Sequence, residues 1–598
     1  MASHERSPAP TRRPRALPVL LALGCGWQAA SAAVLTVGPT GEAGCSHTSL
    51  QSAINAAAAL PGLDIIRMTL ATYPATHVVV GEAGELAIEG GYVSCTTPVI
   101  AGRSTLAGQT PSGLGPVLNH SGAGLLTLQR LVIRDGQAST DASPRGGGVA
   151  STGSGALVMR NVDLIGNRAR FGAGLAVGAK PVTLDGVGFN SNIASISGGG
   201  LYAEGATVMI EGEGTSYFLG NWAQGAAGGN GGGAIHARNS DVFIDAVPPA
   251  GFGFMDDNFA QYQGGAVHFI NTAGLTRYLW LRNRDPQRPL VVIRNDASIG
   301  GAFYLASTSS SSAAYTSVSA NFTDTIVADN TATDGAAFFL QSNGPAATAL
   351  TAVAMAAAGV DTPHCAAALR CNRLEGNVSG NAGTIYMLNQ GSSGRTRFRL
   401  IRGHLIDNHA PGDSVVGGTG ILETDNAIVG HNVGGQAGLF SGSEILLQNT
   451  TVARNTITGA RLFTLSGGVG SFPPLTIQNS IVHQPGRSLI AAHPTGSYLF
   501  RNLLVGSGHG IVNPAGLNVV EFADPGFVNA GGGDYRLAPG SPAVDRYGAG
   551  GGVTLPTLDL FGGLRPAAPP SAPGPYDVGA HEFNSVVDPI FNDTFDNN

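Results

Sequence analysis

Residues 258–268 read NFAQYQGGAVH, and residues 295–304 read NDASIGGAFY. Each stretch contains an asparagine, a short run of mixed residues and a cluster of small residues centred on a glycine pair. The same order recurs along the chain at spacings of 26 to 47 residues. The aligned positions are Gly148, Gly174, Gly200, Gly233, Gly265, Gly301, Ala336 and Gly383. A repeat of this length predicts a stack of similar structural units.

An asparagine precedes each cluster from Gly174 onward, usually by 6 to 8 residues and once, where glycines are inserted, by 12. These asparagines are Asn167, Asn192, Asn221, Asn258, Asn295, Asn330 and Asn377, and Asn408 and Asn455 continue the rhythm without a glycine pair. Asparagine and glycine tolerate left-handed backbone angles, so they indicate corners between short strands. Stacked corners would let the amides hydrogen-bond in a ladder. Helical repeats are disfavoured, because each glycine would cost a helix about 1 kcal/mol.

The residue after each cluster is apolar and is expected to point into the core of the stack. This inward column comprises Val149, Leu175, Leu201, Ile235, Val267, Phe303, Phe338 and Ile385. A single coil cannot bury its apolar face, so many coils must stack into a solenoid. The sequence therefore predicts an all-β protein built as one elongated parallel β-helix.

The pairing of FLGN at residues 218–221 with GAI at 233–235 resembles the FxxN and GGA(I/L/V) repeats of polymorphic outer-membrane proteins. It also looks like the wider group of exported, pectate-lyase-like right-handed β-helices. The resemblance covers residues 146–385 and implies a right-handed parallel β-helix. That group includes lyases, hydrolases and adhesins, so the resemblance leaves the activity open. The chain lacks a C-terminal segment long and alternating enough for a membrane barrel, so self-anchoring is not expected.

Composition narrows the class of protein. Of 598 residues, 89 are glycine and only 12% are charged, and the net charge is −7. A coiled coil needs more charge, and a nucleic-acid-binding protein needs a positive footprint. We therefore expect no nucleic-acid partner.

The first 32 residues resemble a secretory signal. A start with four arginines precedes the apolar run at residues 16–26, and Ala30-Ser31-Ala32 forms a small-residue cleavage site. No later segment reaches the roughly 18 apolar residues of a membrane span. The tail at residues 588–598 (DPIFNDTFDNN) resembles those of proteins exported by Gram-negative bacteria. The protein is expected to be secreted or held at the cell surface.

Four cysteines follow the signal, and an even number in an exported chain favours disulfides. Nearness in sequence pairs Cys45 with Cys95 and Cys365 with Cys371. Zinc is the alternative, but neither a CxxC motif nor matching histidines accompany the cysteines.

The chain divides into five expected parts. Residues 1–32 are the signal, 33–100 an N-terminal cap with the first coils, 101–520 the β-helix, 521–583 a closing region and 584–598 the tail. A helix is predicted over residues 49–60 and would cover the open end of the first coil. The closing region resembles the last part of exported β-helix proteins that carry interchangeable C-terminal anchors.

The candidate ligand site is a second column. Residues one position beyond the inward column alternate to the opposite face of each strand and should point outward. From the third coil they are Tyr202, His236, His268, Tyr304, Phe339 and Tyr386, here called the ring column. Coils stack about 4.8 Å apart, so these side chains would form a ladder of rings. An exposed ladder suits the faces of sugars. The alternative is that the rings only stabilise the sheet.

Candidate catalytic residues are scattered. Asp256-Asp257 with the later Gly508-His509-Gly510 superficially resembles the polygalacturonase-type hydrolases, but the accompanying Asn-Thr-Asp and Arg-x-Lys motifs are absent. A lyase would need a basic side chain and commonly calcium. Lys180, the sole lysine, is expected in a solvated turn, and Arg282, Arg284 and Arg288 in a polar loop.

The densest ionic group lies in the closing region and is expected to fasten its loops. It comprises Asp545, Asp559, Arg565, Asp577 and Glu582. We therefore expect a non-catalytic protein, without a cofactor, that binds glycans or cell-surface components. The alternatives are a lyase or hydrolase acting on an acidic polysaccharide, with calcium if it is a lyase, and a purely structural module. The oligomeric state is left open.

Overall fold

The computed structural model describes residues 33–583 except residue 61 and residues 109–114, 139–144, 286–288, 311–314, 345–348, 357–371, 391–393, 467–473, 491–497, 512–518, 547–557 and 566–575. The expected signal, the tail and the expected Cys365–Cys371 pair lie outside the described residues. Within the described part, no helix has both the length and the apolar character needed to cross a membrane.

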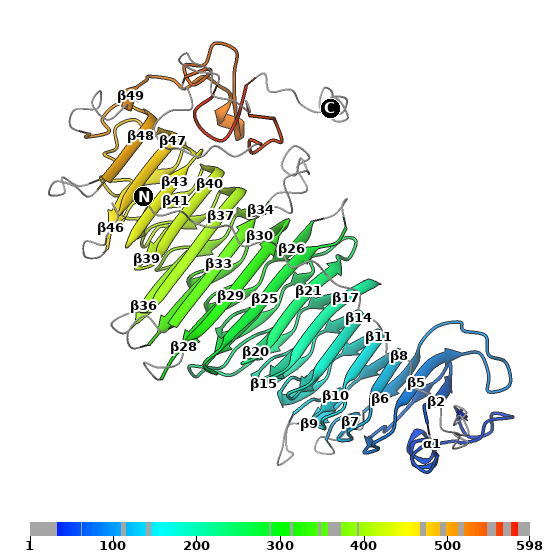
Figure 1. The fold of residues 1–598 in the computed structure, drawn as a ribbon. Coiled ribbons are helices and arrows are strands. Elements are labelled where there is room, and N and C mark those ends of the chain that lie inside the picture. Colours follow the sequence, from blue (N-terminus) through cyan, green and yellow to red (C-terminus); the bar gives the residue numbers. More distant parts are fainter. Residues whose placement is uncertain are drawn as a thin grey trace, which may run out of the picture.

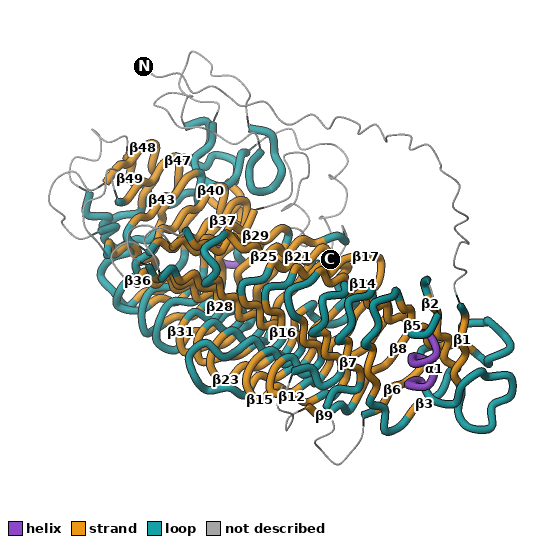
Figure 2. Tube along the Cα trace, turned by 60° about the horizontal axis from the view of Figure 1, so that its bottom comes forward, coloured by secondary structure: helices purple, strands orange, loops and turns teal. Residues whose placement is uncertain are grey.

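One coil near the middle shows the repeating order of strands. β20 (Ile235–Arg238) is followed by β21 (Asp241–Val247), β22 (Met255–Asp256) and β23 (Phe259–Gln263), and β24 (Val267–Asn271) then pairs in parallel with β20. Equivalent strands pair into sheets of 25, 13 and 11 strands, here called sheets A, B and C. Figures 1 and 2 show the coils stacked along an elongated body, with sheet A facing the viewer in Figure 1. The chain is a parallel β-solenoid, as the repeat predicts.

Asparagine side chains form the corner between sheets A and C. The ladder comprises Asn167, Asn192, Asn221, Asn258, Asn295, Asn330, Asn377, Asn408, Asn432 and Asn455, all buried. Along the ladder, each Nδ2 donates to Oδ1 of the next asparagine at 2.9–3.0 Å. The predicted asparagine ladder is confirmed, and Asn432 adds a rung to it.

The inward column is confirmed as well. All eight of its side chains are buried in one continuous core that runs through the solenoid. Where the column becomes aromatic, Phe303 and Phe338 stack with ring centroids 4.9 Å apart. The core positions are thus repeated coil by coil at the same point of each strand.

Helix α1 (Leu50–Ala57) lies at the N-terminal end of the solenoid (Figure 2). The Ser49 side chain accepts a hydrogen bond from the Ser52 N–H, which satisfies a free donor of the first turn. The helix buries Leu50, Ala53, Ile54 and Ala57 against β1 (Val34–Val37), β2 (Asp64–Thr69) and β4 (Val78–Val80). The predicted helix is therefore present within residues 49–60.

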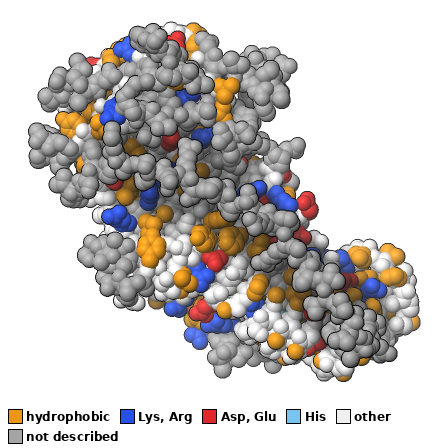
Figure 3. Space-filling model, in the orientation of Figure 1, with side chains coloured by type: hydrophobic (Ala, Val, Ile, Leu, Met, Phe, Trp, Pro, Cys, Tyr) orange, Lys and Arg blue, Asp and Glu red, His pale blue; other side chains and the backbone are white. Residues whose placement is uncertain are grey.

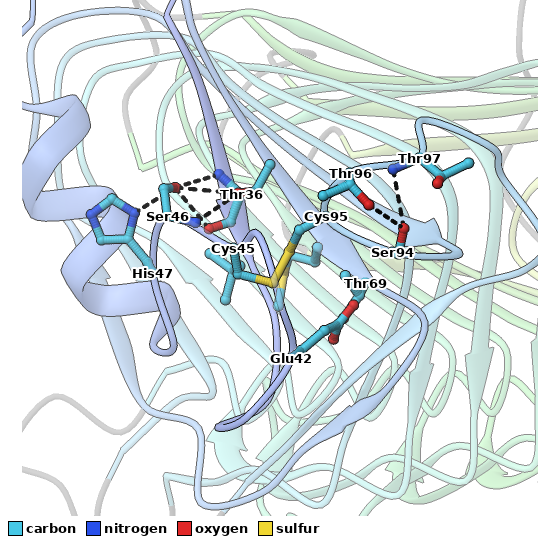
Figure 4. The surroundings of a disulfide bond; sticks show 12 residues. Thr36, Glu42, Cys45, Ser46, His47, Thr69, Ser94, Cys95, Thr96 and Thr97 are labelled. Carbon is cyan, nitrogen blue, oxygen red and sulfur yellow. Dashed lines mark hydrogen bonds between the residues drawn. A yellow bond between two sulfur atoms is a disulfide. The ribbon is translucent and has the colours of Figure 1, made fainter.

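A disulfide joins Cys45 to Cys95, with the two Cα atoms 5.0 Å apart (Figure 4). It links the segment after β1 to the segment after β5 (Leu86–Tyr92) across 50 residues of sequence. The nearby Glu42 carboxylate accepts a hydrogen bond from the Thr69 hydroxyl at 2.7 Å. The first of the two predicted pairings is therefore confirmed.

The C-terminal block, residues 522–583, folds back onto the outer face of sheet A at the last coils (Figure 1, orange to red). It contains a small antiparallel pair, β50 (Phe527–Asn529) with β51 (Asp534–Leu537). Two apolar clusters join it to the solenoid. The first comprises Tyr535, Leu560 and Ala580 with Ile428 and Ala453, and the second Leu537, Ala543 and Val578 with Ile481 and Leu504.

A buried ionic cluster fastens the block. The Arg565 guanidinium pairs with Glu582 at 2.8 Å and donates to Asn426 Oδ1 on the solenoid at 3.2 Å. The Asp559 carboxylate accepts hydrogen bonds from the Gly563 and Glu582 N–H groups. Asp577 Oδ1 accepts from the N–H of Asp545 at 2.7 Å. The expectation that these residues fasten loops of the closing region is confirmed.

Candidate functional site

The ring column forms as predicted. Its residues lie on β16 (Leu201–Glu204), β20, β24, β28 (Phe303–Thr308), β32 (Phe338–Asn343) and β36 (Ile385–Gln390). The strand register places each ring beside the next. Neighbouring ring centroids are 4.7–5.5 Å apart. The spacing follows directly from the distance between stacked coils.

The expectation that the ring column is exposed is wrong. The first five side chains, from Tyr202 to Phe339, expose only 0–6% of their surface, and Tyr386 is partly exposed. They point away from the solenoid core but are covered by side chains at the ends of sheet C strands. Phe171, at the end of β12 (Arg168–Phe171), contacts the Tyr202 ring at 5.2 Å. Ile299, at the end of β27 (Asp296–Ile299), packs on the Tyr304 and Phe339 cluster.

The glycine clusters explain how the rings fit beside the backbone. Gly300 has a φ of 69°, and a Cβ there would lie 3.0 Å from the Cβ of Tyr304. At Gly335 the corresponding distance to the Cβ of Phe339 is 2.9 Å. A larger residue at either glycine would also clash with the carbonyl oxygen of Phe303 or Phe338, at 2.6 and 2.7 Å, so the backbone beside the ring has room only for glycine. The cluster and the ring four residues later form one packing unit.

Two histidines lie next to each other in the middle of the ring column. Nδ1 of His236 and Nδ1 of His268 are 3.0 Å apart, so one ring must donate and the other accept. Burial lowers the pKa of His236 to about 3. Burial, followed by the charge of His236, lowers the pKa of His268 well below its usual value. Both rings are neutral at physiological pH and act as packed, hydrogen-bonded rings.

The ring column ends at a small polar group. Its next position, Gly417, has no side chain, and a Cβ there would lie 2.9 Å from the Asp413 carboxylate and 3.3 Å from the Tyr386 ring. Burial and the charges of Asp413 and Asp334 raise the pKa of the Tyr386 phenol. Burial also raises the pKa of Asp413, and the nearby charge of Asp334 adds to it. Two carboxyl groups thus flank the ring column's partly exposed end.

Lys180 is not in a solvated turn, contrary to the prediction. It is 5% exposed, directly precedes β14 (Pro181–Asn190), and its Nζ donates to Ser151 Oγ at 3.0 Å. Nδ1 of His120 lies 2.9 Å from the same hydroxyl. Burial lowers the pKa of Lys180 to about 8 and is the largest cause lowering that of His120 to about 4.

The chemistry of this trio is limited by its position. A serine beside a lysine of lowered pKa is the arrangement of an activated nucleophile. Ser151, however, lies two residues after Val149 on β10 (Val149–Ser151), so it faces the core and is fully buried. Substrate has no route to the hydroxyl. The trio therefore fills a polar part of the interior.

Lys180→Met is expected to stabilise the protein at pH 7 by about 2 kcal/mol. The pKa shift from 10.5 to about 8 corresponds to about 3 kcal/mol, and loss of the hydrogen bond to Ser151 offsets about 1 kcal/mol of it. The folded pKa of about 8 lies below the ordinary 10.5, so the cost of the buried ammonium develops as the pH falls from 10.5 to 8 and is fully present below 8. The gain should shrink at pH 10.5. Denaturant midpoints at both pH values measure it, with exposed Arg168→Met as the control for lost charge. A variant no more stable than wild type at pH 7 would contradict the assignment.

An exposed aromatic group lies on the outer face of sheet A. Met209 on β17 (Thr207–Thr215), Phe243 on β21, and Tyr278 and Trp280 on β25 (Thr276–Asn283) form what we call the aromatic face. Met209, Tyr278 and Trp280 are 38–45% exposed. The Trp280 ring lies 5.2 Å from Phe243 and 5.9 Å from Tyr278. Figure 3 shows hydrophobic side chains gathered midway along this side of the molecule.

Sequence reasoning missed the aromatic face, although a signal was present. Residues 276–283 read TRYLWLRN, in which Leu279 and Leu281 alternate with Tyr278, Trp280 and Arg282. That alternation places the leucines in the core and the two large rings outside. Arg282 lies on β25 and not in the expected loop, whereas Arg284 follows the strand; both are exposed, and they pair with Asp245 and Glu213. Arg288 lies outside the described residues.

The hydrolase-like residues are not brought together. Asp257 occupies a corner with a φ of 55°, as expected for a turn, and Asp256 is buried and paired with Arg294 at 2.6 Å. His509 pairs with Glu521 just after β48 (Tyr498–Val505). Eight coil steps of about 4.8 Å separate β22 from β48, roughly 40 Å in all.

Metal-ligating side chains gather at one place in the described part of the chain. Glu42, Cys45 and Cys95 bring three candidate ligand atoms within 4.8 Å of one another. Both sulfur atoms belong to the disulfide, so neither can bind a metal as a thiolate. The calcium that a lyase would need has no comparable carboxylate cluster among the described residues.

Comparisons of the sequence with protein-family models and with curated proteins return no match. A β-solenoid by itself hosts enzymes and binding proteins alike, so the fold does not assign an activity. The function has to be inferred from the side chains that this chain presents.

Proposed function

We propose that this chain is an exported protein that binds glycans or glycan-bearing cell surfaces and does not cleave them. The observation that carries the proposal is the aromatic face. Met209, Tyr278 and Trp280, which are 38–45% exposed, lie with Phe243 on the successive strands β17, β21 and β25, so they form one continuous apolar surface on the outside of sheet A. The signal-like residues 1–32 and the Gram-negative type of tail support secretion or display at the cell surface.

The finer architecture belongs to the same proposal. We place the chain among right-handed, pectate-lyase-like β-helices, because connections between parallel strands are right-handed in about 98% of cases. Helix α1 would serve as the N-terminal cap, since it covers β1, β2 and β4 at the end of the stack. An uncovered end would leave unpaired strand edges open to aggregation.

Sugars are amphipathic, and the aromatic face presents both apolar surface and polar groups to them. The rings of Trp280 and Tyr278 present apolar surface to the C–H face of a sugar, and the Tyr278 hydroxyl and Trp280 N–H supply polar contacts at the edges. Around them, Asp241 pairs with Arg277 at 3.0 Å. Such paired charges can hydrogen-bond sugar hydroxyls without giving the face a net charge.

The ring column has a smaller part in this proposal. Its buried members hold sheet B against sheet C, and only Tyr386 keeps surface for a ligand. Binding at Tyr202, His236, His268, Tyr304 and Phe339 would require the covering side chains to move away. We therefore expect His268→Ala with Tyr304→Ala to lower stability more than affinity.

The test is co-sedimentation of the chain from Ala33 onward with a panel of plant, algal and bacterial polysaccharides. Tyr278→Ala with Trp280→Ala should weaken binding about tenfold or more, since each lost ring contact is worth on the order of 1 kcal/mol. Trp222→Ala removes a comparably exposed tryptophan from sheet C and is the control. New reducing or unsaturated ends, or full binding by the Tyr278/Trp280 variant, would overturn the proposal.

A hydrolase or lyase is the second candidate, and the end of the ring column favours it. Asp413 and Asp334 flank Tyr386, and a carboxyl group with a raised pKa beside a second carboxylate is the pairing that glycosidases use. If any polysaccharide yields new ends, Asp413→Asn should abolish them. Activity that survives this change would exclude the pair as the catalytic site.

A further inference from the structure

A row of arginines lies on the same face of sheet A. β37 (Arg395–Ile406) begins RTRFR, and alternation places Thr396 and Phe398 inward and Arg395, Arg397 and Arg399 outward. All three arginines, here called the arginine row, are exposed. Side chains on one face of a strand follow each other at about 6.8 Å, so the row forms a line of three cations.

The strand register aligns the arginine row with the aromatic face. Trp280 lies three coil steps from Arg399, by way of Asn321 and Ala354. Tyr278 lies three steps from Arg397, by way of Ser319 and Ala352. The span is about 14 Å at the usual distance between coils.

Only short side chains stand between the two groups on these columns. β29 (Thr316–Thr323) contributes Ser319 and Asn321, and β33 (Ala349–Ala356) contributes Ala352 and Ala354. No large side chain on these columns therefore rises between the rings and the cations. A single extended ligand lying across the strands could touch both.

The arginine row already binds a carboxylate in the structure. Glu423 on β40 (Ile421–Gly430) pairs with both Arg397 and Arg399, and its Oε2 lies 2.6 Å from Nε of Arg399. Arg395 has no acidic partner among the described residues. Three guanidinium groups thus share one directly paired carboxylate, and the Asp425 carboxyl group lies near Arg399, which leaves at least one unbalanced positive charge in a chain whose net charge is −7.

Charge complementarity decides the ligand class. A planar guanidinium fork matches a carboxylate in two parallel hydrogen bonds, and successive cations along β37 suit an anion that repeats along a polymer. Beside the aromatic face, by contrast, Arg277 and Arg282 are paired with Asp241 and Asp245. Of these two groups of side chains, the arginine row is the one that carries unbalanced positive charge.

We propose that the glycan is a carboxylated polysaccharide, whose sugar rings pack on Tyr278 and Trp280 while carboxylates farther along the same chain pair with the arginine row. This inference rests on the proposed function, because it assigns the substrate class of the same binding face. It adds the arginine row as the element that selects charge, on a different sheet from the ring column.

The experiment compares one polyuronate with the same polymer after its carboxyl groups have been reduced to alcohols. Wild type is expected to bind the polyuronate at least tenfold more tightly than the reduced polymer. The variant Arg395→Gln, Arg397→Gln, Arg399→Gln, Glu423→Gln should bind both polymers equally, at the affinity of wild type for the reduced one. Removal of Glu423 avoids an unpaired carboxylate, and circular dichroism verifies folding.

The matched control removes exposed charge elsewhere, with Arg168→Gln and Arg170→Gln on sheet C; this variant should keep the preference of wild type. Equal binding of both polymers by wild type would overturn this inference and leave the proposed function standing. Binding of neither polymer, nor of any other polysaccharide in the panel, would overturn both. Dextran sulfate that binds as tightly as the polyuronate would also overturn it, because the row would then respond to charge density alone.

Discussion

At pH 8.5, above the pKa of about 8 of Glu582, replacing Arg565 with methionine is expected to lower the free energy of unfolding of the C-terminal block by about 3–5 kcal/mol, the usual cost of removing one partner of a buried ion pair. The Arg565 side chain is 1% exposed and that of Glu582 4%. The guanidinium also donates to the Gly579 carbonyl at 2.7 Å and to Asn426 on the solenoid. Without it, Glu582, Asp559 and Asp577 share a buried space with no cation.

Hydrogen exchange of the block's amides measures this effect directly, with protection factors corrected for intrinsic rates. The control is Arg536→Met in the same block, because that arginine pairs with Asp534 but is 52% exposed. Exposed pairs contribute about 0–1 kcal/mol, so the control should keep its protection. Equal losses in the two variants would mean that the buried pair does not fasten the block.

Because of the same ionic cluster, the stability of the C-terminal block is expected to fall as the pH rises. Burial raises the pKa of Glu582 to about 8 from an ordinary 4.5, and that of Asp577 to about 6 from 3.8. A folded pKa above the unfolded one gives stability that is complete below the unfolded pKa and is lost as the pH rises through the folded value. Protection should therefore fall between pH 5 and pH 8.5, and Arg565→Met should be destabilised most at pH 8.5.

Asn295→Ala is expected to destabilise the middle of the solenoid by about 2–5 kcal/mol, because each buried group left without a partner costs about 1–3 kcal/mol. Oδ1 of Asn295 accepts from the backbone N–H and the amide of Asn258 at 3.1 and 2.9 Å. Its Nδ2 donates to Asn330 Oδ1 and to the carbonyls of Met255 and Ile293. The alanine variant removes the acceptor of the Asn258 backbone N–H and one of the three acceptors of its Nδ2.

Urea midpoints followed by hydrogen exchange in β22, β23 and β27 measure this loss. Asn321→Ala is the control, since Asn321 lies on the outer face of sheet A in a nearby coil and is only partly buried. Asn295→Asp keeps an acceptor for Asn258 but turns a second oxygen toward three other acceptors, so it should be nearly as damaging at pH 7. If Asn295→Ala unfolds at the same urea concentration as Asn321→Ala, the ladder does not hold the corner.

The solenoid could be predicted from sequence because its corners obey local rules. Asparagine before a strand and a glycine cluster after it are required by backbone angles and close approach, as Gly300 shows with its φ of 69°. Each stacked coil has the same requirements, so the same order of asparagine and glycine cluster recurs along the sequence. The register of the ring column followed from the same alignment.

Exposure could not be predicted in the same way. Strand alternation separates the two faces of a sheet, but it does not say whether the outer face meets another sheet. Tyr304 is outside the core and still buried, because sheet C ends against it at Ile299. The prediction that Lys180 lies in a solvated turn was wrong for a related reason. A residue before a proline is typical of a turn, yet the Lys180 side chain points inward toward Ser151.

The aromatic face and the arginine row lay outside the repeat signal that located the ring column. TRYLWLRN and RTRFR both alternate large or charged residues with buried ones, so each strand could have been assigned two faces. The distance between the aromatic face and the arginine row, however, depends on three coils that differ in their number of residues. Only the register of β25, β29, β33 and β37 brings them together.

The central claim, that a glycan binds on the aromatic face, can be read from a single fluorophore. Residues 33–598 contain two tryptophans, Trp222 on sheet C and Trp280 on the aromatic face. In Trp222→Phe, titration with a binding polysaccharide should shift the emission of Trp280 to the blue and protect it from acrylamide. In Trp280→Phe, the emission of Trp222 should stay unchanged. A change in the emission of Trp222 in Trp280→Phe, with no change in the emission of Trp280 in Trp222→Phe, would contradict the claim.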